Sequence, residues 1–213
     1  MSVLVIGANG KIGRIFCRKA QGAGWPVRAM IRSREQAELF GDLGVEAVLG
    51  DLEGEFASAF DGCDQVVFTA GSGGHTGADK TMLVDLYGAI RAIEESERRG
   101  IEHFVMVSAM RVDAPLSAPP TMRHYFVAKK LADDRLQRST LPYTILRPGR
   151  LTDEAGSGRV RTDGDGSTGV DISRENVADC IAAALLEPSA RGRTIDLLDG
   201  TTPIAGALGS IRP

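Results

Sequence analysis

The sequence predicts an α/β fold in which a doubly wound parallel sheet carries helices on both faces. Strand-like and helix-like segments alternate along the whole chain, the pattern that builds a parallel sheet from βαβ units. The strand-like runs are almost wholly apolar, as expected of strands buried on both sides. The length of 213 residues allows one sizeable core, so we expect a single domain over residues 1–213.

The expected strands are short apolar runs bounded by glycine, proline or polar residues, at 3–6, 27–31, 45–49, 65–70, 104–107, 143–146 and 194–198. Helical spacing of apolar residues predicts helices over 12–23, 34–40, 83–93, 128–136 and 174–186, the last with Ser173 as its N-cap. Residues 152–170 are rich in Gly, Asp, Ser and Arg. We expect them to form an irregular or hairpin-like excursion on the substrate side of the fold.

The charge pattern argues against a nucleic-acid partner. The formal net charge is −3, and the chain has no long cluster of lysine and arginine. The nearest approach is Arg28, Arg32 and Arg34, which we assign to a smaller anion. No apolar run approaches the roughly 20 residues that cross a bilayer. With no charged leader before the first strand, we expect a cytoplasmic protein.

The cysteines and histidines point to no metal site. Cys17, Cys63 and Cys180 lack metal-type spacing and are interpreted as buried thiols in a reducing compartment. His75 and His103 have no carboxylate at useful spacing.

The strongest motif is the glycine loop Gly7-Ala8-Asn9-Gly10-Lys11-Ile12-Gly13, between the first strand and the first helix. Glycines at these turns let the backbone bend tightly, approach a pyrophosphate and pack the helix on the strand. The helix start offers free N–H groups and a positive dipole end to the phosphates. We therefore predict dinucleotide binding; the alternative is a tight turn that has lost its ligand.

The G-x-x-G-x-x-G spacing resembles that of the short-chain dehydrogenase/reductase superfamily. The resemblance extends over nearly the whole chain. It implies a Rossmann-type doubly wound sheet and the use of NAD or NADP.

The end of the second strand favours NADP over NAD. An NAD site usually has a carboxylate here to bind the ribose hydroxyls, whereas this chain has Arg32-Ser33-Arg34. Arg32 offers a fork of donors to a 2′-phosphate, and Ser33 could donate to the same group. The alternatives are a capping box formed by Ser33 and Gln36, and a solvated Arg34.

Two further segments match parts of the family's cofactor site. The resemblance implies that Asp51 and Leu52 contact the adenine, with the carboxylate on the amine and the leucine beneath the base. It also implies that Thr69, Ala70 and Gly71 lie against the cofactor ribose. For Asp51 the alternative is a turn at a strand end.

The candidate chemistry rests on Tyr125-Phe-Val-Ala-Lys129, which matches the family's Y-x-x-x-K. Residues i and i+4 share a helix face, and an ammonium beside a phenol is expected to lower the phenol's pKa. The resemblance implies that Tyr125 is the acid/base, that Lys129 also holds the nicotinamide ribose, and that Ser108 binds the substrate oxygen. The alternative is a family remnant in which Lys129 binds only the cofactor. His124 points elsewhere on the helix and is a weaker candidate.

Pro148 and Gly149 follow the sixth strand and match a family segment at the edge of the nicotinamide pocket, with Arg147 undecided. Only about sixty residues follow Gly149, so the chain resembles a compact, atypical member of the superfamily.

Three functions remain open from the sequence. The first is an NADP-dependent oxidoreductase acting on a small carbonyl, alcohol or quinone-like compound. The second is a non-catalytic sensor of the NADP/NADPH ratio, and the third is a redox-neutral epimerase or dehydratase. The expected state is a monomer or homodimer with a small-molecule substrate.

Overall fold

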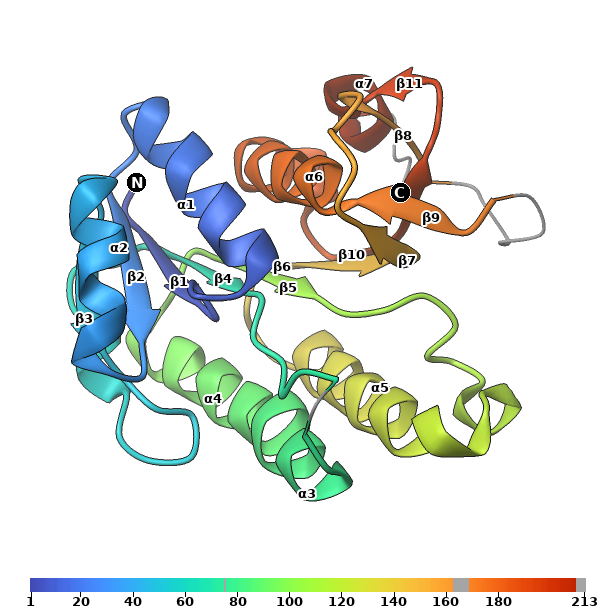
Figure 1. Cartoon of the computed structure of the whole chain (residues 1–213), viewed down its shortest axis with the longest axis horizontal. Coiled ribbons are helices and arrows are strands. Elements are labelled where there is room, and N and C mark those ends of the chain that lie inside the picture. Colours follow the sequence, from blue (N-terminus) through green and yellow to red (C-terminus); the bar gives the residue numbers. More distant parts are fainter. Residues whose placement is uncertain (75, 163–168, 210–213) are drawn as a thin grey trace.

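The central feature of the structure, a computed structural model, is a sheet built by alternating strands and helices (Figure 1). The structure describes residues 1–74, 76–162 and 169–209. Within them the sheet has the order β11-β8-β10-β6-β5-β4-β1-β2-β3, and the strands from β10 to β3 pair in parallel. The parallel strands are β1 (Val3–Ile6), β2 (Val27–Ile31), β3 (Glu46–Leu49), β4 (Gln65–Phe68), β5 (His103–Val107), β6 (Tyr143–Pro148) and β10 (Arg193–Asp199).

Helices cover both faces of this sheet (Figure 1). The principal helices are α1 (Lys11–Gly22), α2 (Ala37–Asp42), α4 (Ala89–Arg99), α5 (Arg123–Gln137) and α6 (Arg174–Leu186), with the short α3 (Ala78–Lys80) and α7 (Ile204–Gly209). Helices α1 and α6 lie on one face, while α4 and α5 lie on the other. The fold class predicted from the sequence is therefore confirmed.

Side chains on the two faces of the central strands pack into two separate hydrophobic cores. In β1, Val3 and Val5 pack with Phe16 of α1, whereas Leu4 and Ile6 pack in the other core. Successive side chains of a strand point to opposite faces, so every residue of β1 is buried. This explains why the central strands are apolar at every position rather than at alternate ones.

The sheet continues beyond β10 in the opposite sense. Strand β8 (Arg159–Arg161) pairs antiparallel with β10, and β11 (Thr202–Pro203) pairs with β8. A separate two-stranded parallel ribbon joins β7 (Arg150–Thr152) to β9 (Asp171–Ser173). The predicted excursion over residues 152–170 thus contributes β8, which lies between β10 and β11, and leads into β9 of the parallel ribbon. Its residues 163–168 lie outside the described part of the chain.

The helix that follows β4 differs from the prediction. Thr81–Gly88 is a π-helix that leads directly into α4. The expected apolar face included Leu83 and Tyr87, yet these side chains are 42% and 56% exposed, while Leu86 is buried. The i→i+5 pairing of a π-helix shifts the angular positions of its residues, so a 3.6-residue repeat assigns them to the wrong face.

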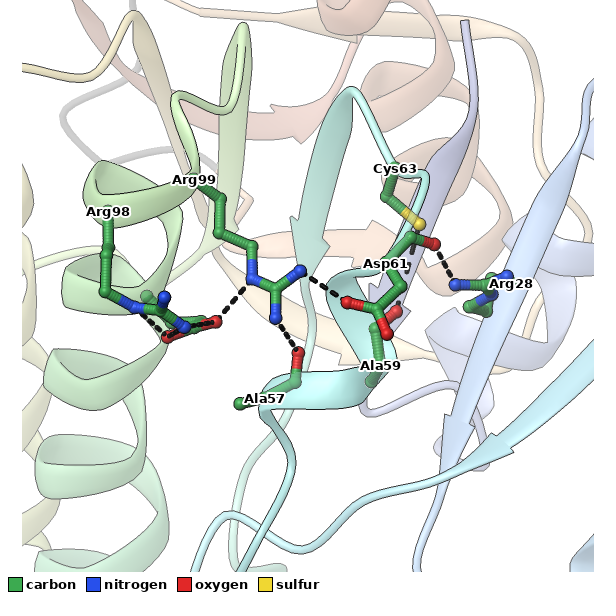
Figure 2. Close-up of polar contacts among 8 residues, drawn as sticks. Arg28, Ala57, Ala59, Asp61, Cys63, Arg98 and Arg99 are labelled. Atoms are coloured by element: carbon green, nitrogen blue, oxygen red, sulfur yellow. Dashed lines mark hydrogen bonds and ion pairs between the residues drawn. The ribbon is translucent and has the colours of Figure 1, made fainter.

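At the β2–β3 edge of the sheet, Arg28 is bound to other residues of the protein and is not available to an anion shared with Arg32 and Arg34. Figure 2 shows Arg28 donating to the backbone carbonyl of Asp61, whose carboxylate binds Arg99. Arg28 also pairs with Glu46 at 2.9 Å. Arg28 therefore stabilises the β2–β3 edge, and the assignment of Arg28, Arg32 and Arg34 to one anion is wrong for Arg28.

Candidate functional site

A cavity of about 360 Å³ opens where β1, β2, β3 and β4 end. Residues that follow each of these strands line it, as expected for a ligand site at the carboxyl edge of a parallel sheet. The predicted cofactor residues on its wall are Gly7, Asn9, Gly10, Arg32, Asp51, Leu52, Thr69, Ala70 and Gly71. The cavity therefore brings together segments that lie far apart in the sequence.

The glycine loop leaves no room for side chains at two of its positions. Gly7 has φ +87°, and a Cβ atom there would lie 2.5 Å from the backbone nitrogen of Ala70. A Cβ on Gly13 would lie 2.5 Å from the carbonyl oxygen of Gly7. Helix α1 begins directly after Gly10 without a side-chain cap, so its first N–H groups are available to an anion.

Thr69 ties the end of β4 to the glycine loop. Its hydroxyl lies 3.2 Å from the carbonyl oxygens of both Ile6 and Gly7, to either of which it can donate. This contact fixes the glycine loop against the segment 69–73, which forms the opposite wall of the cavity.

The floor of the cavity is held by an arginine from α4. Arg91 donates to the carbonyl oxygens of Leu52 at 2.8 Å and Gly54 at 2.9 Å, and its guanidinium lies 4.7 Å above the Phe56 ring. Asp51 accepts a hydrogen bond from the backbone of Glu53, which tightens the same turn. Leu52 is buried and faces the cavity. The turn predicted for the adenine ring is thus rigidly positioned.

Arg32 lies on the cavity wall at the end of β2. Its backbone N–H donates to the side chain of Gln36, but across the described residues its guanidinium has no hydrogen bond or ion pair. A free guanidinium in a cavity fits a phosphate. The capping box predicted for Ser33 and Gln36 is wrong, since the Ser33 hydroxyl caps no N–H and Gln36 binds Arg32 instead.

Several cavity residues were missed from the sequence: Met30, Gln36, Glu53, Ser72, Gly73, Thr76, Lys80 and Val84. Lys80 and Glu53 form an ion pair at 2.7 Å between α3 and the turn that holds Asp51. Their spacing in the sequence carries no signal of this contact. Ser72 and Gly73 directly follow Thr69, Ala70 and Gly71, which were expected to lie against the cofactor ribose.

Other predicted cofactor residues lie away from the cavity lining. The Lys11 ammonium forms an ion pair with Asp153 at 2.6 Å, and Ile12, on α1, packs in the hydrophobic core beneath that helix. Pro148 is buried at the end of β6. A Cβ on Gly149 would lie 2.1 Å from the carbonyl oxygen of Val170, so this glycine allows the chain before β9 to approach β6. Their contacts to a cofactor stay predictions.

The candidate catalytic residues come from the end of β5 and from α5. Ser108 follows β5, and its buried hydroxyl has no hydrogen-bond partner among the described residues. Lys129 is buried on α5, and its ammonium nitrogen lies 5.8 Å from the centre of the Tyr125 ring. It also lies 3.4 Å from the carbonyl oxygen of Val107, the residue before Ser108. The three side chains predicted from sequence therefore come from adjacent elements.

Two buried carboxylates, missed from the sequence, complete this cluster. Asp85 lies 3.4 Å from the ammonium of Lys129. Asp133 binds Arg147 at 2.9 Å, and Arg147 also binds Asp113 at 2.6 Å. Arg147, undecided from sequence, thus fastens the segment after β5 to α5. One oxygen of Asp133 has no partner within hydrogen-bond geometry in the described chain. Burial raises the pKa of Asp133, and the nearby Ser108 hydroxyl and Arg147 offset only part of that rise.

The pKa of Tyr125 shifts in the direction opposite to the prediction. Removal from water raises it, Lys129 lowers it, and Asp85 and Asp133 raise it further, so the pKa lies above its ordinary value. Burial acts to lower the pKa of Lys129, but Tyr125, Asp85 and Asp133 outweigh it and raise that pKa. The expectation of a lowered Tyr125 pKa considered only the positive charge of Lys129. It left out the burial of Tyr125 and the negative charges of Asp85 and Asp133.

No histidine or cysteine is among the described residues that line the cavity. His103 is buried and bonded to Thr144, and His124 does not line the cavity. His75 lies outside the described residues. Cys17 and Cys180 are buried, and burial raises the pKa of each thiol to about 12. Over the described ranges, no group of His, Cys, Asp and Glu is arranged to hold a metal.

No helix in the described part of the chain is long and apolar enough to cross a membrane.

Comparisons with known proteins agree with this geometry. Residues 7–188 match a family described as NAD(P)H-binding. A Bacillus subtilis protein named as an uncharacterized sugar epimerase, YhfK, is 46% identical, over 98% of this chain and 99% of its own length. The resemblance inferred from the motifs is confirmed: the chain is a compact, atypical relative of the short-chain dehydrogenases.

Solved structures share the same fold. A Bacillus halodurans protein, whose name proposes an NAD-dependent epimerase/dehydratase, has a TM-score of 0.95 at 45% identity, with 99% of this chain and 100% of that chain covered. The oxidoreductase ylbE of Lactococcus lactis has a TM-score of 0.88 at 27% identity, with 99% of this chain and 96% of that chain covered.

Proposed function

The chain belongs to the NAD(P)H-binding family, and from this premise we propose that it is an NADP(H)-dependent oxidoreductase of small carbonyl compounds. The observation that carries the proposal is that Lys129, on the same helix as Tyr125, is linked through Asp85 to the glycine-lined cavity. Ser108, Tyr125 and Lys129 are not themselves among the described residues that line this cavity. Asp85 connects the two parts, because it bonds the cavity wall at Ser72 and contacts Lys129.

The cavity residues fit a dinucleotide. Gly7 lets the glycine loop pack against the backbone of Ala70, and the uncapped start of α1 offers its N–H groups to a pyrophosphate. The guanidinium of Arg32, which has no partner in the described part of the chain, supports a 2′-phosphate and hence NADP in preference to NAD. When bound, the reduced nucleotide would supply a hydride.

The residues around the reacting oxygen have distinct roles in this proposal. Tyr125 donates a proton to that oxygen, and the buried Ser108 hydroxyl, which has no partner within hydrogen-bond geometry among the described residues, binds it. Among the described residues, the polar contacts of the buried Lys129 ammonium are 3.4 Å long, so hydrogen-bonding capacity remains for the hydroxyls of a ribose.

The names of relatives favour one other candidate. Both YhfK and the Bacillus halodurans protein carry names that refer to epimerases. A redox-neutral epimerase would retain its nucleotide through purification and would consume none of it, which separates the two functions.

The test is NADPH oxidation with a panel of small aldehydes, ketones and quinones. We expect turnover by the wild-type protein, loss of turnover in Tyr125→Phe, and retention in Tyr87→Phe, whose ring is 56% exposed. Full activity in Tyr125→Phe contradicts the proposed chemistry. NADPH binding without turnover of any compound favours the non-catalytic sensor.

A further inference from the structure

The cluster around Lys129 contains more negative charge than a Tyr–Lys pair requires. Tyr125, Lys129 and Asp133 follow one another at four-residue spacing on α5, so they share one face of that helix. Asp85 approaches this face from the π-helix Thr81–Gly88. Both carboxylates are buried, with exposed fractions of 2% for Asp85 and 0% for Asp133.

Asp85 is held so that its charge faces Lys129. One carboxylate oxygen accepts the backbone N–H of Ser72 at 2.8 Å, and the other lies 3.4 Å from the Lys129 ammonium. A Cβ on Gly71 would approach this second oxygen to 3.1 Å, so the cavity wall packs directly on the carboxylate. A π-helix turn is a common device at functional sites, and here it brings Asp85 to the interior.

Asp85 and Lys129 are a buried ion pair, which changes what Lys129 can do. A lone buried ammonium stabilises a neighbouring phenolate strongly, because the interior screens charge poorly. An ammonium already paired with a carboxylate presents little net charge to Tyr125. Lys129 then serves to hold a ribose rather than to ionise the phenol.

We propose that Asp85 is a positioning residue that neutralises Lys129, keeps Tyr125 a protonated donor and so adapts the site to reduction of a carbonyl group. The inference rests on the proposed function. In the reaction, a bound reduced nicotinamide would supply the hydride for the new C–H bond, and the C=O π bond would break. Its electron pair goes to oxygen, which takes the Tyr125 proton; solvent then reprotonates the phenolate.

The other charged groups near Asp85 and Lys129 either add negative charge beside Tyr125 or are paired with an opposite charge. Asp133 adds negative charge from α5 and is itself paired with Arg147 of β6. Asp113, from the segment after β5, pairs with Arg147 and lies 4.0 Å from Lys130. The raised pKa of Tyr125 agrees with this balance, with removal from water as its first cause.

The test is a titration of Tyr125 by phenolate absorbance, taken as the difference between the wild type and Tyr125→Phe. We expect Tyr125 of the wild type to titrate above the value of about 10 for free tyrosine. In Asp85→Asn, measured against Asp85→Asn/Tyr125→Phe, the midpoint should fall by about one pH unit or more, because Lys129 is left as an unpaired cation. Asp134→Asn is the matched control, since Asp134 lies on the same helix but pairs with Lys130.

Titration of wild-type Tyr125 below that of free tyrosine would overturn the proposal, as would an unchanged or higher midpoint in Asp85→Asn. A wild-type midpoint below that of free tyrosine would overturn the proposal even where Asp85→Asn does not fold. The titration needs neither nucleotide nor substrate. A protein that binds no NADPH would therefore refute the proposed function while leaving the assignment of Asp85 open to this same measurement.

Discussion

His103 is expected to make the stability of the fold strongly dependent on pH. The imidazole is fully buried in β5, and its Nε2 atom lies 2.9 Å from the hydroxyl oxygen of Thr144. Thr144 donates its single hydrogen to the carbonyl oxygen of Ala190 at 2.8 Å. Nε2 must therefore carry a proton and donate to Thr144, which leaves Nδ1 deprotonated and without a partner in the described chain.

The size of the effect follows from the pKa of the buried ring. Burial, with a smaller contribution from Arg191, lowers the pKa of His103 from 6.5 to about 4. A base whose pKa is lowered by folding contributes its full stability above the unfolded value, and that stability is lost as the pH falls from 6.5 towards 4. At 1.36 kcal/mol per pKa unit, the loss is about 2 kcal/mol at pH 5 and about 3 kcal/mol at pH 4.

The assay is urea unfolding between about pH 8 and pH 4 for the wild type and His103→Gln. Glutamine can still donate to Thr144 but does not titrate, while the carboxylates that contribute to acid sensitivity are the same in both proteins. The difference in unfolding free energy between the two should therefore shrink as the pH falls. A difference that stays constant across this range would refute the assignment of His103 as a buried neutral base.

Two further predictions concern the elements that build the cavity and the sheet edge. Gly13→Ala should lower the free energy of unfolding by roughly 1–3 kcal/mol and weaken NADPH binding, because the new Cβ meets the Gly7 carbonyl; Gly22→Ala in the same helix has open space and should do neither. Equal behaviour of the two variants in urea unfolding and calorimetry would contradict the packing argument. Ser173→Ala should cost about 1 kcal/mol in thermal unfolding, since the Ser173 hydroxyl accepts the N–H of Asn176 at the start of α6, and no loss would contradict that role.

The parts of the site that the sequence predicted are those formed by local backbone constraints. The glycine loop, the strand ends and the Tyr125–Lys129 spacing each follow from a few consecutive residues, so their chemistry is visible before the chain is folded. The N-cap at Ser173 is likewise local, and the structure confirms it.

The parts that were missed depend on contacts between distant segments. Asp85 meets Lys129 only because a π-helix turns it inward, and no 3.6-residue repeat predicts that turn. A single carboxylate within the apolar stretch from Met82 to Leu86 was the available signal. The Asp133–Arg147 pair was not predicted because an aspartate on a helix with many charged residues is usually solvated. Gly149, assigned to the pocket by resemblance, has a packing partner at Val170 that only the folded chain reveals.

The central claim is most directly tested by calorimetric titration of the purified protein with NADPH and NADH, in the wild type, Arg32→Ala and Arg34→Ala. Arg34 is the matched control, because it is exposed and does not line the cavity. The account predicts tighter binding of NADPH than of NADH, and a selective loss of roughly ten- to a hundredfold for NADPH in Arg32→Ala, the size of a lost charge-assisted hydrogen bond. Equal binding of both nucleotides, unaffected by Arg32→Ala, would contradict the NADP assignment, and no binding of either would contradict the proposed function.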